Sequence, residues 1–297
     1  MLGALELVGR KDDVQSMSIQ DPVSLTSRWV AAARALESRR ADRLFEDPYA
    51  ELLAGPEGFA LLERMAHARQ GPAASHENPY LAIRTRFIDD YVTVTLSQSS
   101  IRQIVILAAG LDVRAYRLSF PEGTRLIELD RPEVLDFKES ALSEAGAEPA
   151  CARATHGADV TQPFDAALAA CGYDRTRPAL WLVEGLLPYL DESQAHGVLA
   201  RCAALAAPGS RIVGDMPGIS LLRSEMMRQT MRELEDLKAP WKFGTDDPEG
   251  LLSSVGWKAT VLRPGDPGAG FGRWPFPMPP RGTPGLPQAF YFTATRG

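Results

Sequence analysis

The residues with the clearest chemical meaning lie in the turn that follows the first apolar strand. QIVILAA (103–109) is a continuous apolar run, typical of a strand buried on both faces of a parallel sheet, and it leads through Ala108 into Gly110 and Asp112. A glycine-bearing turn at the carboxyl end of such a strand is where doubly wound folds bind nucleotides. A tight turn would account for Gly110 equally well, so other positions must decide.

The charge of this turn distinguishes two classes of cofactor. A dinucleotide site needs G-x-G-x-x-G, so that backbone amides and a helix N-terminus meet a pyrophosphate. Here the first and third glycine positions hold Ala108 and Val113, and Asp112 would repel a pyrophosphate. S-adenosylmethionine has no phosphate and carries a sulfonium and an ammonium group. The acidic turn therefore favours S-adenosylmethionine over a nicotinamide dinucleotide.

The second strand, TRLIELD (124–130), ends in an aspartate. Asp130 lies twenty residues after Gly110, and an acidic side chain at this point can accept hydrogen bonds from both ribose hydroxyls of an adenosine. A helix cap is the alternative, because Arg131-Pro132 would begin the next helix. We expect Asp130 to bind the ribose.

Two later strands also end in polar residues. Asp159 and Val160 follow ARATHGA (152–158), where the carboxylate could take an adenine amino group and the Val160 amide a ring nitrogen. A simple turn would explain Asp159 equally well. Glu184 lies near the end of ALWLVEG (179–185), and a carboxylate that emerges from an apolar strand needs a partner. The cationic end of the cofactor would supply that partner.

Two arginines lie on the helix that precedes the first strand. Arg84 or Arg86 could bind the methionyl carboxylate of the cofactor through two parallel hydrogen bonds. An ion pair with Asp89 or Asp90 at helical spacing is the alternative, and the spacing alone slightly favours it.

The need for a general base depends on the methyl acceptor. Methyl transfer from a sulfonium is an in-line displacement that depends mainly on positioning and exclusion of water. A carboxylate acceptor, with a pKa of about 4, is already ionised, whereas a phenol, with a pKa of about 10, would benefit from a base. Only His67 and His76, which flank a Gly-Pro turn, are candidate bases. No group of residues demands a nucleophile or a metal.

These residues need a parallel α/β sheet to bring them together. We expect an N-terminal extension over 1–21 without fixed structure, a helical cap over 22–98 and a Rossmann-like core over 99–297 in one domain. The core carries two insertions over the acceptor site, 217–257 and 264–287.

The core segments alternate between strand and helix patterns, as a parallel sheet requires. Further strands are expected at 210–216, 258–263 and 290–296. A single helix with three methionines is expected over 219–237, and no regular structure over 264–287.

Composition excludes several classes of protein. The 297 residues are 45% apolar and 24% charged, with a formal net charge of −6 and no cluster of Lys and Arg, so we expect no nucleic-acid partner. No window reaches the roughly 18 apolar residues of a membrane span. The three widely spaced cysteines suit reduced thiols of a cytoplasmic protein.

Seven segments in order resemble the leucine carboxyl methyltransferase family. The resemblance is closest to a bacterial branch that includes O-methyltransferases of polyketide pathways, and it covers about residues 24–216. The segments are SRWVAAARALES, EDPYA, RTRFIDDYV, VILAAGLDVRAYRL, IELDRPEVLDFK, GADV and LVEGLLPYL.

The resemblance implies a class I methyltransferase fold with a seven-stranded, mostly parallel sheet, a reversed last strand and S-adenosylmethionine as cofactor. It assigns Arg84 to the cofactor carboxylate, Asp130 to the ribose, Asp159 and Val160 to the adenine, and Glu184 to the cofactor. The family's first-helix basic residue aligns loosely with Arg28.

The family turn usually reads G-A-G-x-D-T-R, and here Ala108 replaces the first glycine and Val113 the threonine. Ala108 adds a methyl group where backbone and cofactor approach each other closely.

We therefore expect methyl transfer to a carboxylate or phenolic hydroxyl of a small molecule, an aromatic or carboxylic acid of polyketide type. Met226, Met227 and Met231, with Trp274 and Phe276, would shape the acceptor pocket or pack in the core. The alternatives are methylation of a protein's C-terminal carboxylate, nicotinamide-dependent oxidoreduction and a non-catalytic regulatory module that binds cofactor or a partner.

Overall fold

A single sheet organises the part of the chain that the structure describes. The computed structural model describes residues 22–68, 79–283 and 286–297, and within them seven strands form a sheet in the order β3-β2-β1-β4-β5-β7-β6. The strands are β1 (Gln103–Leu107), β2 (Arg125–Asp130), β3 (Ala152–Gly157), β4 (Leu180–Val183), β5 (Arg211–Pro217), β6 (Trp257–Leu262) and β7 (Ala289–Arg296).

The direction of the strands places the candidate site. β1 runs parallel to β2 and β4, and β4 runs parallel to β5. β7 is antiparallel to β5 and to β6, so it is the reversed last strand that the family resemblance implied. The carboxyl ends of β1, β2, β3, β4 and β5 consequently lie at one edge of the sheet.

Alternating side chains of the central strands build two separate cores. Ile104 and Ile106 face α3 (Pro79–Gln98), while Val105 and Leu107 face the opposite side. The remaining helices of the sheet region are α4 (Arg114–Arg117), α5 (Pro132–Glu144), α6 (Asp165–Ala170), η3 (Leu187–Tyr189), α7 (Glu192–Leu205) and α10 (Pro248–Ser254). Every residue of β1 is buried, which explains its uninterrupted apolar sequence.

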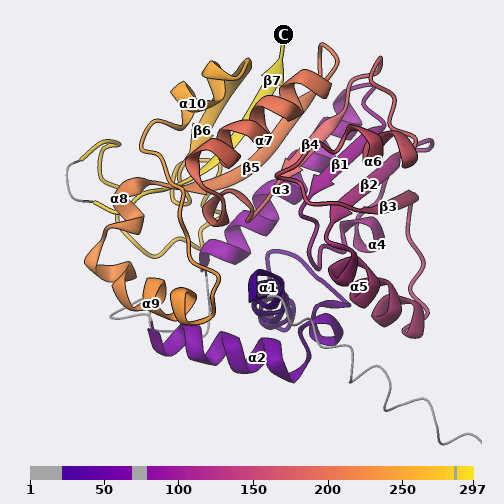
Figure 1. Cartoon of the computed structure of the whole chain (residues 1–297). Coiled ribbons are helices and arrows are strands. Elements are labelled where there is room, and N and C mark those ends of the chain that lie inside the picture. The colour runs from indigo at the N-terminus through magenta and orange to yellow at the C-terminus, as the bar shows by residue number, and fades with distance from the viewer. Residues whose placement is uncertain (1–21, 69–78, 284–285) are drawn as a thin grey trace, which may run out of the picture.

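A helical cap lies across the carboxyl edge of the sheet. It consists of α1 (Pro22–Ser38) and α2 (Ala50–Ala68), which lie beneath the strands in Figure 1 and share one apolar core. α2 contains a kink at Gly55 (φ +57°). The backbone conformation of Gly55, followed by a proline, interrupts the helix.

The prediction of one helix over 219–237 was wrong. The segment forms α8 (Ile219–Leu222), the short 3-10 helix η4 (Glu225–Met227) and α9 (Arg228–Asp236). Ser224 separates the first two pieces, because its hydroxyl accepts a hydrogen bond from the Met227 amide at 3.3 Å. A side chain that competes with the helical backbone in this way favours a cap over a helix interior.

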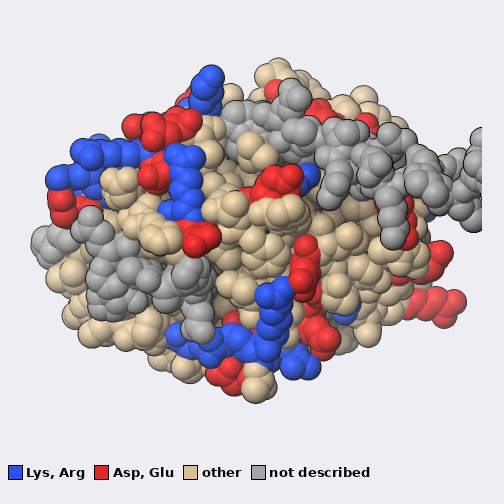
Figure 2. Space-filling view, turned by 90° about the horizontal axis from the view of Figure 1, so that it is seen from below, with Lys and Arg blue, Asp and Glu red and all other residues tan. Residues whose placement is uncertain are grey.

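Several expectations concern features away from the site. Residues 264–283 and 286–287 contain no helix or strand, as expected, whereas the extension 1–21 lies outside the described residues. Within the described ranges, no helix is long and apolar enough to cross a bilayer. Cys171 and Cys202 are buried free thiols and Cys151 is half-buried. The underside of the molecule shows basic and acidic side chains interspersed among the described residues (Figure 2).

Candidate functional site

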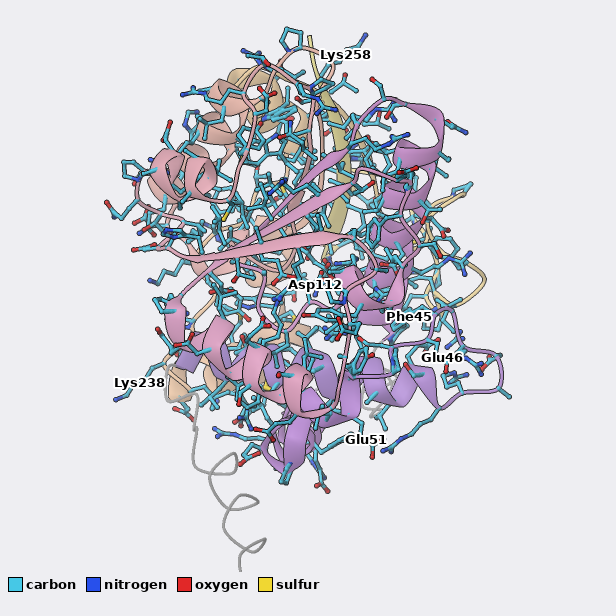
Figure 3. All side chains as sticks on the ribbon, turned by 90° about the vertical axis from the view of Figure 1, so that its right-hand side faces the viewer. Phe45, Glu46, Glu51, Asp112, Lys238 and Lys258 are labelled. Atoms are coloured by element: carbon cyan, nitrogen blue, oxygen red, sulfur yellow. The ribbon has the colours of Figure 1, made fainter. Side chains whose placement is uncertain are left out.

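A cavity of about 1250 Å³ lies between the carboxyl edge of the sheet and the cap. Its lining contains all the residues that the sequence assigned to the cofactor: Arg84, Ala108, Gly110, Asp130, Asp159, Val160 and Glu184. Asp112, which also lines the cavity, lies below the strands and above the cap helices in Figure 3. The structure thus brings residues from four strand ends and one helix to a single site.

The turn after β1 has an unusual backbone. Gly110 has a φ of +49°, and Ala108 has a φ of +51°, a region that glycine occupies without strain and alanine does not. A Cβ atom on Gly110 would lie 3.4 Å from the Cβ of Ser27 on α1, so this turn passes directly beneath the cap. The positive φ of Ala108 gives a physical reason for the glycine that the family usually places there.

Asp130 is anchored to the same turn. Its Oδ2 accepts a hydrogen bond from the Gly110 amide at 2.6 Å, and its Oδ1 accepts one from the Arg131 amide at 2.7 Å. Burial raises the pKa of Asp130, and these two amide hydrogen bonds oppose that effect. The N-cap of α5 is Arg131 and no side chain caps it, so Asp130 does not cap this helix. A carboxylate held at the cavity wall suits the expected ribose contact.

The residues after β3 divide between surface and core. Asp159 is exposed, and its Oδ1 accepts hydrogen bonds from the amide and the hydroxyl of Thr161 at 2.9 and 2.7 Å. Val160 is buried in the core on one face of the sheet. Asp159 therefore stabilises a turn, which was the alternative to adenine binding, and it also lines the cavity.

Glu184 lies between two buried guanidinium groups. Its Oε1 accepts from Arg84 Nε at 2.9 Å and its Oε2 accepts from Arg114 at 2.7 Å. Burial alone would raise the pKa of Glu184, but the positive charges of Arg114 and Arg84 outweigh it and lower the pKa to about 2. The partner that a buried carboxylate needs is thus supplied by the protein.

Arg84 and Arg86 have different partners. Arg84 is buried and pairs with Glu184 and with Asp215, whose Oδ2 lies 3.1 Å from Arg84 Nη1. Arg86 forms the helical ion pair that spacing favoured, with Asp90 at 2.8 Å. Asp89 instead pairs with the arginines of α4. Of the two candidates, only Arg84 lines the cavity.

The charged groups around Arg84 form one network. It comprises four carboxylates and three guanidinium groups, which leaves one excess negative charge; its members are Asp89, Asp112, Glu184, Asp215, Arg84, Arg114 and Arg117. A cationic ligand is electrostatically favoured beside such a network. S-adenosylmethionine, with its sulfonium and ammonium groups, fits the residues present.

Sequence reasoning missed two residues of this site. Asp215 lies near the carboxyl end of β5, and this position on a strand parallel to β4 was the available signal. Arg34 of α1 lines the cavity and donates to the Leu111 carbonyl at 2.6 Å. Arg28, the loosely aligned basic residue, lies elsewhere: it pairs with Glu57 and stacks over a phenylalanine ring of α5. Arg34 is therefore the basic residue that the first helix presents to the cavity.

Of the two candidate bases, the structure describes only His67, and it does not bring that residue to the cavity. His67 is exposed on the last turn of α2, with Nδ1 2.7 Å from the Glu63 carbonyl oxygen, and it does not line the cavity. His76 lies outside the described residues. His156 and His196 are exposed and are not among the residues that line the cavity.

Apolar side chains from the C-terminal half of the chain line another part of the cavity wall. Met226, Met227, Trp274 and Phe276 line it, and the two aromatic rings meet edge to face with centroids 5.2 Å apart. Met231 instead packs with the core of the cap. The cavity thus joins a charged end at the strand edge to an end under the 217–241 and 264–283 segments that carries these four apolar side chains together with Arg273.

Comparisons with known proteins agree with this geometry. The family model described as leucine carboxyl methyltransferase matches residues 27–203. A "Putative S-adenosyl-L-methionine-dependent methyltransferase" of Mycolicibacterium gilvum is 36% identical over 270 residues, covering 86% of this chain and 90% of that protein. A protein of the same description from Saccharopolyspora erythraea is 37% identical over 272 residues, covering 87% of this chain and 91% of its own length.

Solved structures show the same fold at low sequence identity. A crystal structure of a "putative methyltransferase" from Thermobifida fusca has a TM-score of 0.64 at 16% identity and covers 98% of this chain and 99% of that chain. A DUF574 family protein from Streptomyces avermitilis has a TM-score of 0.59 at 15% identity, over 90% of this chain and 97% of that chain. The chain therefore belongs to the leucine carboxyl methyltransferase family and is an S-adenosylmethionine-dependent methyltransferase with a Rossmann-like fold.

Proposed function

We propose that the protein transfers the methyl group of S-adenosylmethionine to an oxygen atom of a small acceptor, a carboxylate in preference to a phenolic hydroxyl. The observation that carries this proposal is the size and division of the cavity. Ligand pockets are typically about 300–1,000 Å³, and this cavity of about 1250 Å³ continues beyond the cofactor residues into an apolar chamber. An acceptor can therefore lie beside the cofactor under the cap.

The preference for a carboxylate acceptor rests on the hydrogen bonds and ion pairs that already engage the acidic side chains of the cavity. Six carboxylates line the described cavity, and each already accepts a hydrogen bond or forms an ion pair. They are Glu37, Asp112, Asp130, Asp159, Glu184 and Asp215. Donors of the protein occupy these carboxylates, which leaves them less available to take a proton from an acceptor. A phenol would have no strong acceptor for its proton here, whereas an ionised carboxylate needs none.

The tyrosines of the cavity support the same conclusion. Burial raises the pKa of Tyr80 and of Tyr189, so both hydroxyls stay protonated at neutral pH. The Tyr80 hydroxyl donates to Asp215 at 2.8 Å and the Tyr189 hydroxyl donates to Thr26 at 3.1 Å, and neither protonated hydroxyl can remove a proton from an acceptor. The bound cofactor supplies the electrophilic methyl group. The chain's own residues orient both ligands and exclude water.

The apolar chamber favours a flat aromatic acid of polyketide type over an extended peptide. Methionine and aromatic side chains adapt to flat apolar ligands, and Met226, Met227, Trp274 and Phe276 form this wall. Methylation of a protein's C-terminal carboxylate is the second candidate, since the family is described as leucine carboxyl methyltransferase.

A labelled-methyl transfer assay tests the proposal. Purified protein is incubated with methyl-labelled S-adenosylmethionine and four acceptor sets: aromatic carboxylic acids, matched phenols, peptides with free C-termini and the same peptides amidated. We expect label in the aromatic acids, released as methanol by mild base because the product is a methyl ester. Base-stable label in the phenols would show that the acceptor is a phenolic hydroxyl rather than a carboxylate. Label in the free-ended peptides alone would favour methylation of a protein's C-terminal carboxylate.

Controls separate absence of an acceptor from absence of cofactor binding. Calorimetric titration with S-adenosylmethionine and S-adenosylhomocysteine accompanies the assay. Binding without transfer to any set would contradict an oxygen acceptor of these classes. Failure of both ligands to bind would favour the non-catalytic alternative, for which the Ala108 turn is the only support.

A further inference from the structure

Asp215 receives three donors from two segments, the turn after β4 and helix α3. Its Oδ1 accepts a hydrogen bond from the Gly185 amide at 2.7 Å, and its Oδ2 accepts from the Tyr80 hydroxyl at 2.8 Å and from Arg84 Nη1 at 3.1 Å. The residue is only 2% exposed, yet it lines the cavity at the end of β5. It joins the β4 end, the start of α3 and the buried guanidinium group.

Gly185 completes the surface on which Arg84 rests. Gly185 has a φ of +63°, and a Cβ atom there would lie 3.4 and 3.5 Å from the Nη1 and Nη2 atoms of Arg84. The guanidinium group therefore lies close against the glycine backbone. Asp215 fixes both partners of this contact, because it holds the Gly185 amide with one oxygen and Arg84 with the other.

The arrangement constrains the direction of the guanidinium plane. Glu184 accepts from Nε and Asp215 accepts from Nη1, so two carboxylates hold two neighbouring nitrogens. Glu184 also pairs with Arg114 at 2.7 Å and is shared between two cations. Asp215 pairs with no other arginine among the described residues, which makes it the carboxylate dedicated to Arg84.

We propose that Asp215 is a positioning residue for the cofactor: it orients Arg84 toward the carboxylate of the methionyl group of S-adenosylmethionine. The inference rests on the role assigned to Arg84 in cofactor binding. Asp215 does not touch the cofactor carboxylate, which it would repel; it acts through the guanidinium group. A preorganised guanidinium loses less freedom when it binds a carboxylate than a mobile one does.

The test compares two ligands that differ by one carboxylate. S-adenosylmethionine and its decarboxylated analogue share the adenosine, the sulfonium and the amine. We expect the unaltered protein to bind S-adenosylmethionine about tenfold to a hundredfold more tightly, as a charge-assisted carboxylate contact predicts. Asp215→Asn should reduce this ratio to below about threefold and leave the Kd of the decarboxylated analogue within about twofold.

Two control variants separate the possible failures. Arg84→Ala should abolish the preference for the carboxylate; if it does not, the role of Arg84 is wrong. If Arg84→Ala abolishes the preference and Asp215→Asn retains it, only the positioning role of Asp215 is overturned. Glu128→Gln removes an equally buried carboxylate that pairs with Lys138 and Arg153 outside the cavity, and it should leave the ratio unchanged.

A merely structural role for Asp215 predicts a different pattern. A general loss of order in the site would weaken the binding of both ligands equally and leave the ratio of their Kd values unchanged. That result would overturn the proposal. If Asp215→Asn does not fold, Asp215→Glu carries the test, because it keeps the charge and displaces the carboxylate by one methylene. It should lower the ratio selectively, and equal weakening of both ligands would again refute the proposal.

Discussion

Replacing Glu184 by glutamine tests whether the ion-pair network stabilises the site by charge. The variant keeps the size and one oxygen of the side chain but removes the negative charge between Arg84 and Arg114, at 2.9 and 2.7 Å. The amide NH₂ of the glutamine then faces a guanidinium group, so one donor is placed against another. Removal of one partner of a buried pair costs about 3–5 kcal/mol in free energy of unfolding.

The shifted pKa gives an independent value for the same effect. The pKa of Glu184 falls from an ordinary 4.5 to about 2 in the folded protein, which corresponds to about 3 kcal/mol at pH 7. Because the folded pKa is the lower one, this stabilisation is complete above about pH 5 and is lost as the pH falls toward 2. The advantage of the unaltered protein over Glu184→Gln should shrink to about 1 kcal/mol at pH 3.

Urea unfolding followed by tryptophan fluorescence at several pH values measures both quantities. The matched control is Glu51→Gln, which removes the charge of an exposed glutamate on the outer side of α2 that pairs with the exposed Arg39 (Figure 3). It should change the free energy of unfolding by less than about 1 kcal/mol at every pH. A loss below about 1 kcal/mol at pH 7, or a loss that does not depend on pH, would refute the reasoning.

Three further substitutions address the turn, the ribose contact and the segment over the acceptor. Ala108→Gly relieves a φ of +51° and should stabilise the protein by up to about 1 kcal/mol, because relief of about 1–2 kcal/mol exceeds the entropy of an added glycine; a lower thermal midpoint would contradict this. Asp130→Ala should weaken S-adenosylmethionine at least about tenfold by calorimetry, through loss of the ribose contacts, and unchanged affinity would remove Asp130 from the site. Arg273→Gln breaks the pair with Glu37 at 3.0 Å that ties the 264–283 segment to α1, and it should raise the acceptor KM severalfold while the Kd of S-adenosylmethionine stays constant. Equal changes in both constants would show that Arg273 supports the whole cavity rather than its acceptor end.

The sequence alone was sufficient for the sheet and for the position of the site. All seven strands were expected, and β1 and β4 had the clearest signal because a strand buried on both faces must be apolar throughout. The half-exposed β3 has a weaker pattern. Polar residues immediately after such strands must then lie at one edge. Asp130, Asp159 and Glu184 were predicted in this way, and all line one cavity.

The tertiary structure decided which charged groups meet. Arg84 pairs with Glu184 and Asp215, which lie 100 and 131 residues away in the chain, rather than with a neighbour at helical spacing. Likewise Arg34 faces the cavity while Arg28, less than two turns earlier on the same helix, packs against α5. Local spacing cannot specify such contacts, because they depend on how the cap is placed over the sheet.

The same difference between local pattern and tertiary packing explains the two wrong expectations, the single helix over 219–237 and His67 as a base. The helix expected over 219–237 has helix-forming residues, but a serine hydroxyl that caps the Met227 amide divides it. His67 has the chemistry of a base, yet α2 packs against α1 with this residue exposed to solvent. Residue type and periodicity thus determined the strands and the site edge, whereas long-range packing decided which side chains reach the cavity and which charges pair there.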